Sequence, residues 1–304
     1  MFKYAAVLAI VGVCSVGAAP HGSKRDDYKM TNDTTVFQYA LTLEHLEYAF
    51  YTGGLERFDD QAFEAAGFPT WVRGRFKQVQ EHEASHVAFL EAAIGPDAVK
   101  PCTYKFPYTD PKSFVSLAAS IEGVGTAAYT GAAHYITAPG AITDAASILA
   151  TEARHDAWMM SAALEGAPWS GPYQTPLNPD QVYSIAAQFI ESCPSTNAAL
   201  PVKTFPALTV TPATPKPGDT IKVSVSGSNM YMLYHSGSSI LSSDIINGET
   251  TIPKELVGVV YAGVASEKPT GDKPPSSSAM QSGLVILNFG LPASADNNGL
   301  RSQN

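Results

Sequence analysis

Two of the seven histidines follow a glutamate by three positions: His86 follows Glu83, and His155 follows Glu152. Residues three apart lie on one face of a helix, so each pair can offer a carboxylate and an imidazole to the same point. Chance would give fewer than one such pair in 304 residues with seven histidines. Because both groups bind divalent transition metals, the two pairs predict a metal site built from two helices.

A site for two metals in a helical bundle also needs one glutamate from each of two further helices. Glu122 fits this role because it is the one Asp, Glu, Lys or Arg between residues 113 and 143. A carboxylate without a partner in so apolar a helix would cost several kcal/mol, and a divalent metal would remove that cost. We therefore expect Glu122 to bind metal.

The remaining helix offers Glu44 and Glu47, which are again three apart. Tyr129 follows Glu122 by seven residues, and Tyr51 follows Glu44 by the same interval. This correspondence favours Glu44 as the ligand, with Glu47 as the alternative. Two turns along each helix, both tyrosines are expected to hydrogen-bond near the metals.

Apolar residues at helical spacing predict five helices between residues 33 and 191, separated by breaks that contain Pro or Gly. The first four carry the candidate ligands. The loop over residues 96–110 is long enough to carry the chain from one end of a bundle to the other. We expect the first helix over about Thr34–Gly53 and the second from after Thr70 to Gly95. The third should start after Pro111, the fourth should run from after Gly140 to about Gly166, and the fifth should cover Asp180–Ser192.

The residue pattern of the sequence changes after Pro201, where short β-rich runs alternate with Pro, Gly and Ser clusters. This pattern predicts a small β-sandwich over residues 203–292, after a helical domain over residues 26–198. The β-domain contains a single histidine, His235, and no cysteine, so we expect no metal centre of its own. Residues 293–304 are expected to be a disordered tail. The expected β-runs cover residues 207–211, 220–225, 256–261 and 284–288.

The first nineteen residues have the pattern of a cleaved secretory signal, with an apolar run followed by small residues. Residues 20–25 are a possible short pro-segment that ends at the dibasic pair Lys24 and Arg25. We therefore expect a secreted protein, extracellular or in the cell wall. Its formal charge of -9 disfavours nucleic acid and anionic membranes, and no segment is expected to span a membrane.

Cys14 would leave with the signal, so Cys102 and Cys193 remain, and one disulfide is the simplest interpretation in an oxidising compartment. Asn32 begins the one glycosylation sequon, which predicts an exposed position. His82 lies four residues before His86 and is expected beside the metals without binding them. Asp156, next to His155, has two interpretations: it orients an imidazole from a neighbouring helix, or, as is more common for such an acid, it faces solvent.

The ordered set of ligands resembles the ferritin-like superfamily, and more closely the secreted ferritin-like proteins of fungi. These are the late-sexual-development and stress-responsive type, related to plant desiccation proteins. The resemblance implies an α+β chain in which a ferritin-like four-helix bundle, with a fifth short helix, precedes the β-sandwich-like domain. It also implies that two iron or manganese ions are bound by the six candidate ligands. The residues that carry it lie in Tyr39–Tyr51, Glu81–Val87, Ile121–Tyr129 and Glu152–His155.

A site of this kind would support redox chemistry with O₂ or peroxide, in stress response or in development, as a dimetal-carboxylate oxidoreductase. The alternative is a non-catalytic secreted structural or cell-surface binding protein, whose bundle site is structural or vestigial. In either case the β-domain is a candidate for contacts with a cell-wall or surface partner.

Overall fold

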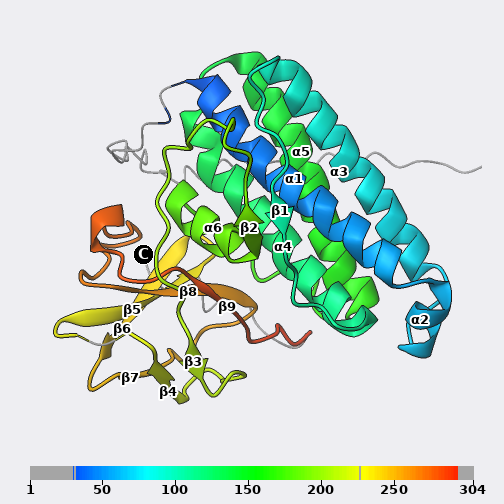
Figure 1. Cartoon of the computed structure of the whole chain (residues 1–304). Helices are drawn as coiled ribbons and strands as arrows, with labels where there is room; N and C mark the ends of the chain where they lie inside the picture. Colours follow the sequence, from blue (N-terminus) through cyan, green and yellow to red (C-terminus); the bar gives the residue numbers. More distant parts are fainter. Residues whose placement is uncertain (1–29, 31, 226, 294–304) are drawn as a thin grey trace, which may run out of the picture.

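The computed structural model describes residues 30, 32–225 and 227–293. The expected signal peptide, the pro-segment with its dibasic pair, and the tail from residue 294 onward lie outside the described residues. Helices form the N-terminal part of the described chain and antiparallel sheets form the C-terminal part (Figure 1). The predicted two-part α+β layout is therefore confirmed.

Four long helices form the bundle, in which α1 packs against α3 and α4 packs against α5 (Figure 1). Their ends carry the expected signals. Asn32 caps α1 by accepting from Thr35 N at 2.9 Å, and Asp110 with Ser113 forms a capping box on α4. Gly95 ends α3 with a φ of +83°, which favours glycine. The helices are α1 (Asp33–Arg57), α3 (Val72–Ile94), α4 (Pro111–Ala132) and α5 (Pro139–Trp158).

Shorter helical elements complete this part of the chain. The helix α2 (Asp60–Ala65) joins α1 to α3, and a 3-10 turn (Ala133–Tyr135) follows α4. The last turn of α5 continues as a π-helical turn (Met159–Ala163). The fifth helix, α6 (Pro179–Ala186), is shorter than expected. It passes through a 3-10 turn (Ala187–Phe189) into the strand β2 (Ile190–Ser192), which pairs with β1 (Thr103–Tyr104).

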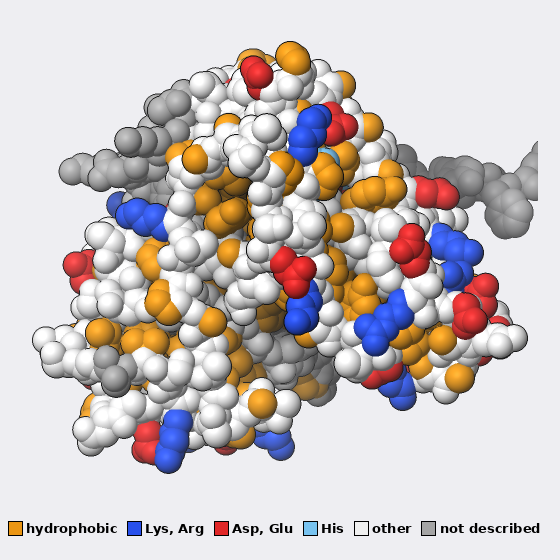
Figure 2. Space-filling view, viewed as in Figure 1, with side chains coloured by type: hydrophobic (Ala, Val, Ile, Leu, Met, Phe, Trp, Pro, Cys, Tyr) orange, Lys and Arg blue, Asp and Glu red, His pale blue; other side chains and the backbone are white. Residues whose placement is uncertain are grey.

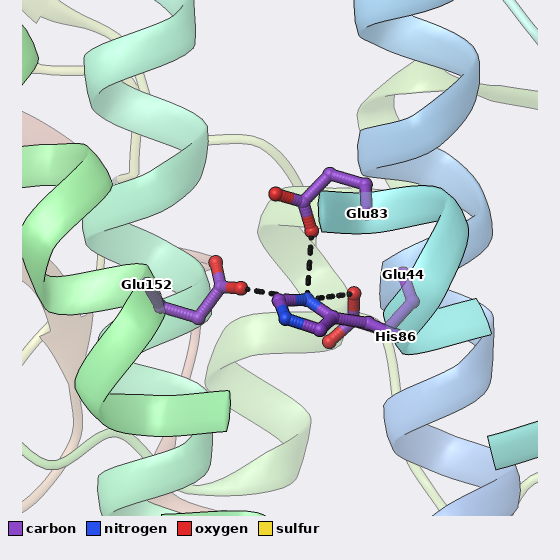
Figure 3. Close-up of side chains that lie close together, drawn as sticks. All are labelled: Glu44, Glu83, His86 and Glu152. Atoms are coloured by element: carbon purple, nitrogen blue, oxygen red, sulfur yellow. Dashed lines mark hydrogen bonds and ion pairs between the residues drawn. The ribbon is translucent and has the colours of Figure 1, made fainter. Parts of the chain in front are cut away.

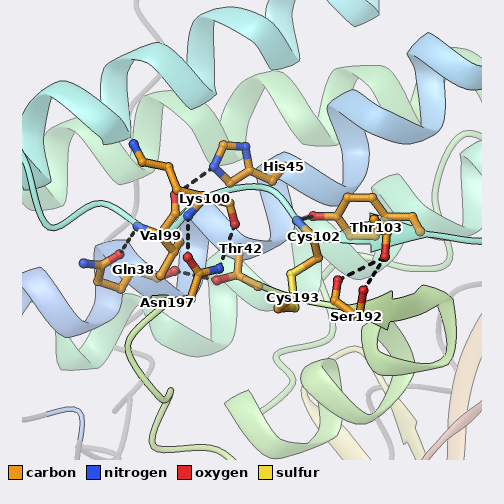
Figure 4. Close-up of a disulfide and its surroundings, with 11 residues drawn as sticks. Gln38, Thr42, His45, Val99, Lys100, Cys102, Thr103, Ser192, Cys193 and Asn197 are labelled. Carbon is orange, nitrogen blue, oxygen red and sulfur yellow. Dashed lines mark hydrogen bonds between the residues drawn. A yellow bond between two sulfur atoms is a disulfide. The ribbon is translucent and has the colours of Figure 1, made fainter. Parts of the chain in front are cut away.

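The predicted disulfide between Cys102 and Cys193 is confirmed, and it lies beside the β1–β2 pair (Figure 4). The loop before Cys102 is held against α1, where Gln38 exchanges two hydrogen bonds with the backbone of Asp97 and Val99. Asn197 does the same with the backbone of Lys100. The long α3–α4 connection is thus fixed along the bundle at several points.

The C-terminal part consists of two antiparallel sheets, one ordered β3-β4-β7 and the other β6-β5-β8-β9. Apolar residues between the sheets form a core of their own, including Ile221, Tyr234 and Val260. The predicted sandwich-like packing is therefore present. The strands are β3 (Val210–Thr211), β4 (Thr220–Val223), β5 (Met230–Ser236), β6 (Ser239–Ile245), β7 (Glu249–Thr251), β8 (Val259–Ala265) and β9 (Val285–Asn288), and a 3-10 turn covers Ser277–Ala279.

The larger sheet also packs against the bundle. Along β5 and β8, alternate residues point to opposite faces, so Tyr234 and Val260 enter the sandwich core while Leu233 and Tyr261 join the core of the helices. Hydrogen bonds fix the junction, including Gly237 N to Thr175 Oγ1 at 2.8 Å. The two parts therefore share one continuous apolar cluster.

In the described part of the chain, none of the helices combines the length and apolar character needed to cross a membrane. On the face shown in Figure 2, acidic and basic side chains are scattered over both parts, with hydrophobic side chains between them. They form no continuous patch of one sign on that face. Asn32 is exposed at the surface, as its sequon predicts. Its side-chain Oδ1 is the atom that caps α1.

Candidate metal centre

Six side chains from the four long helices meet in the middle of the bundle, and we call them the metal centre. They form two groups of four, and within each group one ligand atom per residue lies within 4.8 Å of all the others. Glu83 and Glu152 belong to both groups. The first group adds Glu44 and His86, and the second adds Glu122 and His155. These are the six residues that the sequence spacing singles out.

The first group surrounds the imidazole of His86 (Figure 3). Its Nδ1 lies 3.1 Å from Glu83 Oε2, 3.1 Å from Glu152 Oε1 and 3.3 Å from Glu44 Oε2. Figure 3 shows the three carboxylates pointing toward this ring from α1, α3 and α5. One imidazole therefore meets oxygens from three glutamates.

The second group has a matching arrangement around His155, whose Nδ1 lies 3.2 Å from both Glu83 Oε1 and Glu122 Oε2. Glu83 thus turns one oxygen toward His86 and the other toward His155. A carboxylate placed in this way can bridge two ions, one in each group. Both groups therefore lie side by side across a shared glutamate.

The two tyrosines expected near the metals hydrogen-bond across the bundle. Tyr51, on α1, donates to Glu122 Oε1 on α4. Tyr129, on α4, donates to Glu44 Oε1 on α1 at 2.6 Å. Each tyrosine binds the oxygen that is not aimed at the nearby histidine. The repeated seven-residue interval in the sequence therefore corresponds to a reciprocal pair of contacts between α1 and α4.

His82 lies beside the centre, as its position in the sequence predicts. Its Nδ1 is 2.9 Å from Nε2 of His155, and the two rings are stacked with centroids 5.1 Å apart. Since Nδ1 of His155 faces the carboxylates, His82 contacts the opposite side of that imidazole. Such partners fix the ring orientation and tautomer of a metal-binding histidine.

Glu47 is buried next to the centre but belongs to neither four-residue group. Its Oε1 lies against Gly125, where an added Cβ would come within 2.6 Å of that oxygen. The geometry therefore brings Glu44, and not Glu47, into the cluster. Sequence reasoning missed Gly125, although a glycine inside an otherwise regular helix signals a close approach.

The chemistry of the cluster fits a pair of metal ions. The four glutamates of the centre are fully buried. Four of their oxygens accept no hydrogen bond in the described part of the chain, although all of these but Glu152 Oε2 lie within 3.3 Å of a histidine nitrogen. These atoms are Glu44 Oε2, Glu83 Oε1 and both oxygens of Glu152. Buried carboxylate oxygens are costly unless they are paired or coordinate a metal. A set of four carboxylates and two imidazoles suits iron and manganese.

The pKa values show how strongly the groups interact without metal. Burial raises the pKa of Glu44 to about 7, with repulsion from Glu83 adding to it, and raises that of Glu152 well above its usual range. Burial opposes the charge of both histidines, but hydrogen bonds to the carboxylates outweigh it. The pKa rises to about 10 for His86 and to about 9 for His155. Metal binding must therefore displace protons.

Solvent reaches the centre from one side. A surface cavity of about 530 Å³ between α3 and α5 is lined by His82, His86 and His155, together with Arg75 and Arg154. The side chains of His86 and His155 are 12% and 7% exposed, whereas the glutamates are fully enclosed. A small solute would therefore approach the centre past the two imidazoles.

Residues 32–165 match the ferritin-like domain family. That segment contains all four long helices and all six residues of the metal centre. The helical part of the chain is therefore similar to ferritin-like domains. The chain is also 28% identical over 170 residues to Protein rds1 of Schizosaccharomyces pombe, an alignment that covers 56% of this chain. The chain spans about two fifths, 42%, of that relative's length.

Proposed function

We propose that the ferritin-like domain binds two iron or manganese ions. Glu44 and His86 would hold one ion, Glu122 and His155 the other, and Glu83 with Glu152 would be shared. The observation that carries this proposal is the pair of overlapping four-residue groups, in which four buried carboxylates and two imidazoles converge. The match to the ferritin-like domain family supports it.

We further propose that the protein is an oxidoreductase of the dimetal-carboxylate type. Two such ions would supply electrons to O₂ or peroxide, or accept them. The chain contributes the surroundings of that chemistry. Tyr51 and Tyr129 orient the outer glutamates, His82 orients His155, and the bundle encloses the carboxylates. The cavity between α3 and α5 gives small solutes a path to the imidazoles.

Secretion to the cell exterior or the cell wall is part of the proposal. It is supported by the disulfide, which persists in oxidising compartments, and by the signal-like pattern of the first nineteen residues. The similarity to a fungal protein supports a place among the fungal ferritin-like proteins, for which we propose a role in stress response or sexual development.

Metal analysis of the purified protein and matched variants tests the site. The wild type should contain two iron or manganese ions per chain. Replacing the shared residue in Glu83→Ala should remove nearly all metal, because both groups lose a ligand. Glu81→Ala is the control, since it removes an exposed carboxylate two positions away on the same helix. Two ions retained in Glu83→Ala would exclude the proposed site.

Reactivity separates an enzyme from a structural metal protein. The ferrous protein should consume O₂ or hydrogen peroxide faster than free ferrous ion does, and Glu83→Ala should lose this excess rate. A purely structural site predicts another result: chelation would lower the melting temperature, while the loaded protein would consume oxidant no faster than the control solution. That outcome would reject the oxidoreductase proposal and leave the metal site intact.

A further inference from the structure

A second cavity, of about 430 Å³, lies where the bundle meets the β-domain, and the metal centre does not use it. Its walls come from α4, from the end of α5, from residues 168–175, and from the strands β8 and β9. Its volume falls within the usual range of small-molecule sites, about 300–1,000 Å³. Because both parts of the chain form its walls, this cavity exists only when they are docked.

Two polar groups converge at the inner wall of the cavity. A Cβ added to Gly123 would lie 3.2 Å from the Tyr261 hydroxyl and 3.8 Å from both carboxylate oxygens of Asp156, so the glycine keeps this space open. Tyr261 is only 3% exposed. Neither its hydroxyl nor the Asp156 carboxylate forms a hydrogen bond within residues 32–225 and 227–293. Asp156 therefore lines this surface cavity.

Small-molecule sites place a few polar groups where a ligand can reach them, so an inner wall with two such groups and no protein partner points to a ligand that supplies the partners. The other polar lining side chains include Ser116, Gln174 and Asn288. The amide oxygen of Asn288 already accepts from Gly290 N at 2.9 Å, which leaves its NH₂ group to donate. Donors and acceptors are therefore spread over several walls.

Two aromatic side chains line the cavity and remain open to solvent. Trp169 is 63% exposed and Tyr173 is 66% exposed, which places them at the mouth. The segment that carries them is fixed to the β-domain. Ser170 Oγ accepts from Val259 N, and Thr175 Oγ1 accepts from Gly237 N, both at 2.8 Å. The aromatic faces are thus held ready for contact, at little further entropic cost.

The charge of the cavity restricts its ligand. Asp156 is the one charged residue in the lining, and no Lys or Arg is among the lining residues. An anion would meet a carboxylate without a compensating cation. A purely apolar ligand would leave the inner polar groups without partners, which is costly. A cation would be matched by Asp156 but would leave the hydroxyl and amide groups of the other walls unused. The lining as a whole therefore favours a neutral ligand that offers many hydroxyl groups together with an apolar face.

We propose that this cavity binds a neutral carbohydrate. One face of a pyranose ring consists of C–H bonds and packs on the electron-rich face of an aromatic ring, here Trp169 or Tyr173. The hydroxyl groups at the ring edge hydrogen-bond to the Asp156 carboxylate, the Tyr261 hydroxyl and the amides of the wall. This site gives the β-domain a function that the metal centre does not need.

Calorimetric titration of the full mature chain with glucose, cellotetraose, laminaritetraose and chitotetraose tests the proposal. At least one of these neutral probes should bind. Trp169→Ala should weaken that binding at least about tenfold, and Tyr261→Phe should weaken it by removing one hydroxyl. The control is Trp71→Ala, an aromatic residue that is 47% exposed elsewhere on the bundle, and it should leave the affinity unchanged. Thermal unfolding would confirm that each variant is folded.

The outcomes are distinct. Equal affinity for glucose and a tetrasaccharide indicates a free sugar as the ligand, and binding of a tetrasaccharide alone indicates a glycan chain; either result supports the proposal. The proposal is overturned if no probe binds at about 10 mM, well into the weak-affinity range. It is also overturned if binding persists in both folded variants. Tetramethylammonium and an acidic oligosaccharide are titrated alongside as charged probes, and binding of these alone would likewise overturn the proposal. Metal content has no bearing on these results.

Discussion

Glu44 on α1 and Glu122 on α4 each accept a hydrogen bond from a tyrosine of the other helix. The hydroxyls of Tyr51 and Tyr129 occupy the outer carboxylate oxygens, so the inner oxygens are left to face His155 and His86. Such outer contacts orient a ligand before the metal arrives. The affinity of the centre therefore depends on residues that do not touch the ions.

Tyr51→Phe removes one of these hydroxyls while keeping the ring and its packing. Glu122 then loses its donor, and metal affinity should fall by about 10–100-fold. Competition with a chelator of known affinity measures this loss. Tyr48→Phe is the matched control, because Tyr48 lies on the same helix and is 38% exposed. Equal affinity in the two variants would contradict the orienting role.

The raised histidine pKa values predict that metal uptake depends on pH. His86, with a pKa of about 10, and His155, with a pKa of about 9, are both protonated at pH 7 without metal. Both must lose a proton to bind an ion, so affinity should rise with pH. Uptake at pH 7 should release these two imidazolium protons together with the protons that the raised pKa values leave on Glu44 and Glu152. Calorimetry in buffers of different ionisation enthalpy measures this release, and no dependence on the buffer would contradict it.

The raised pKa values of His86 and His155 also predict how the stability of the metal-free protein changes at alkaline pH. A histidine whose pKa is raised on folding stabilises the folded state fully below its unfolded value of 6.5. That contribution is lost as the pH rises through about 9 to 10. The metal-free protein should therefore lose stability in this alkaline window, whereas the loaded protein, whose histidines are already neutral, should not lose it through these groups.

At the scale of elements, glycines decide how closely α4 can approach its neighbours. Gly131 lies against the Leu177 backbone, where an added Cβ would come within 1.8 Å of the carbonyl oxygen. Gly131→Ala should therefore destabilise the protein by about 1–3 kcal/mol, as overpacking does. Thermal or denaturant unfolding of the metal-free protein measures the change.

Gly74→Ala is the matched control, because Gly74 also lies inside a helix but has no atom within 4 Å of an added Cβ. This change should stabilise the protein by about 0.5–1 kcal/mol through helix propensity alone. The same substitution is thus expected to have opposite signs in α3 and α4. If Gly131→Ala stabilised the protein instead, the Leu177 backbone would be able to move away from the added methyl group at little cost.

The helices and the centre were predictable because both depend on local signals. Caps, prolines and the Glu-x-x-His spacing lie within a few residues of one another, and together they predict where each ligand lies on its helix. The choice between Glu44 and Glu47 rested on an internal comparison with Glu122. The position of Glu47 against Gly125 is a contact between helices, which the sequence of one helix does not contain.

The β-domain was less predictable, because several of its strands lack a regular alternation. The sequence reading did not identify β5, β6 or β7. In β5 the residues from Met232 to Ser236 are all buried, since one face packs in the sandwich and the other faces the bundle. A strand buried on both faces shows no period of two. The strand β8 has the same environment, and only its first residues were included in the expected run.

At the scale of the whole molecule, the junction between the two parts contains a buried histidine. His235, on β5, lies 3.1 Å from the Gln181 amide on α6, and burial lowers its pKa to about 4. The neutral form therefore stabilises the folded state above pH 6.5, and this contribution is lost as the pH falls toward 4. The loss should reach about 3 kcal/mol.

His235→Gln isolates this effect, because glutamine keeps a polar side chain but does not titrate. Melting temperatures of the two proteins, measured from pH 7 to pH 4, should converge as the pH falls, since only the wild type loses the histidine contribution. If the melting temperatures of the two proteins fell in parallel with pH, protonation of His235 would not be what destabilises the junction with the β-domain. Both series should use metal-free protein, so that loss of metal does not contribute.

The disulfide joins two residues that are 91 positions apart, and the chain between them includes α4, α5 and α6. This part of the polypeptide is a closed covalent ring. A protease that cut the exposed segment around Trp169 and Tyr173 would open the ring without separating the molecule into pieces. The cleaved protein should migrate as a single species on a non-reducing gel and as two fragments after reduction, and it should keep both halves of the bundle together.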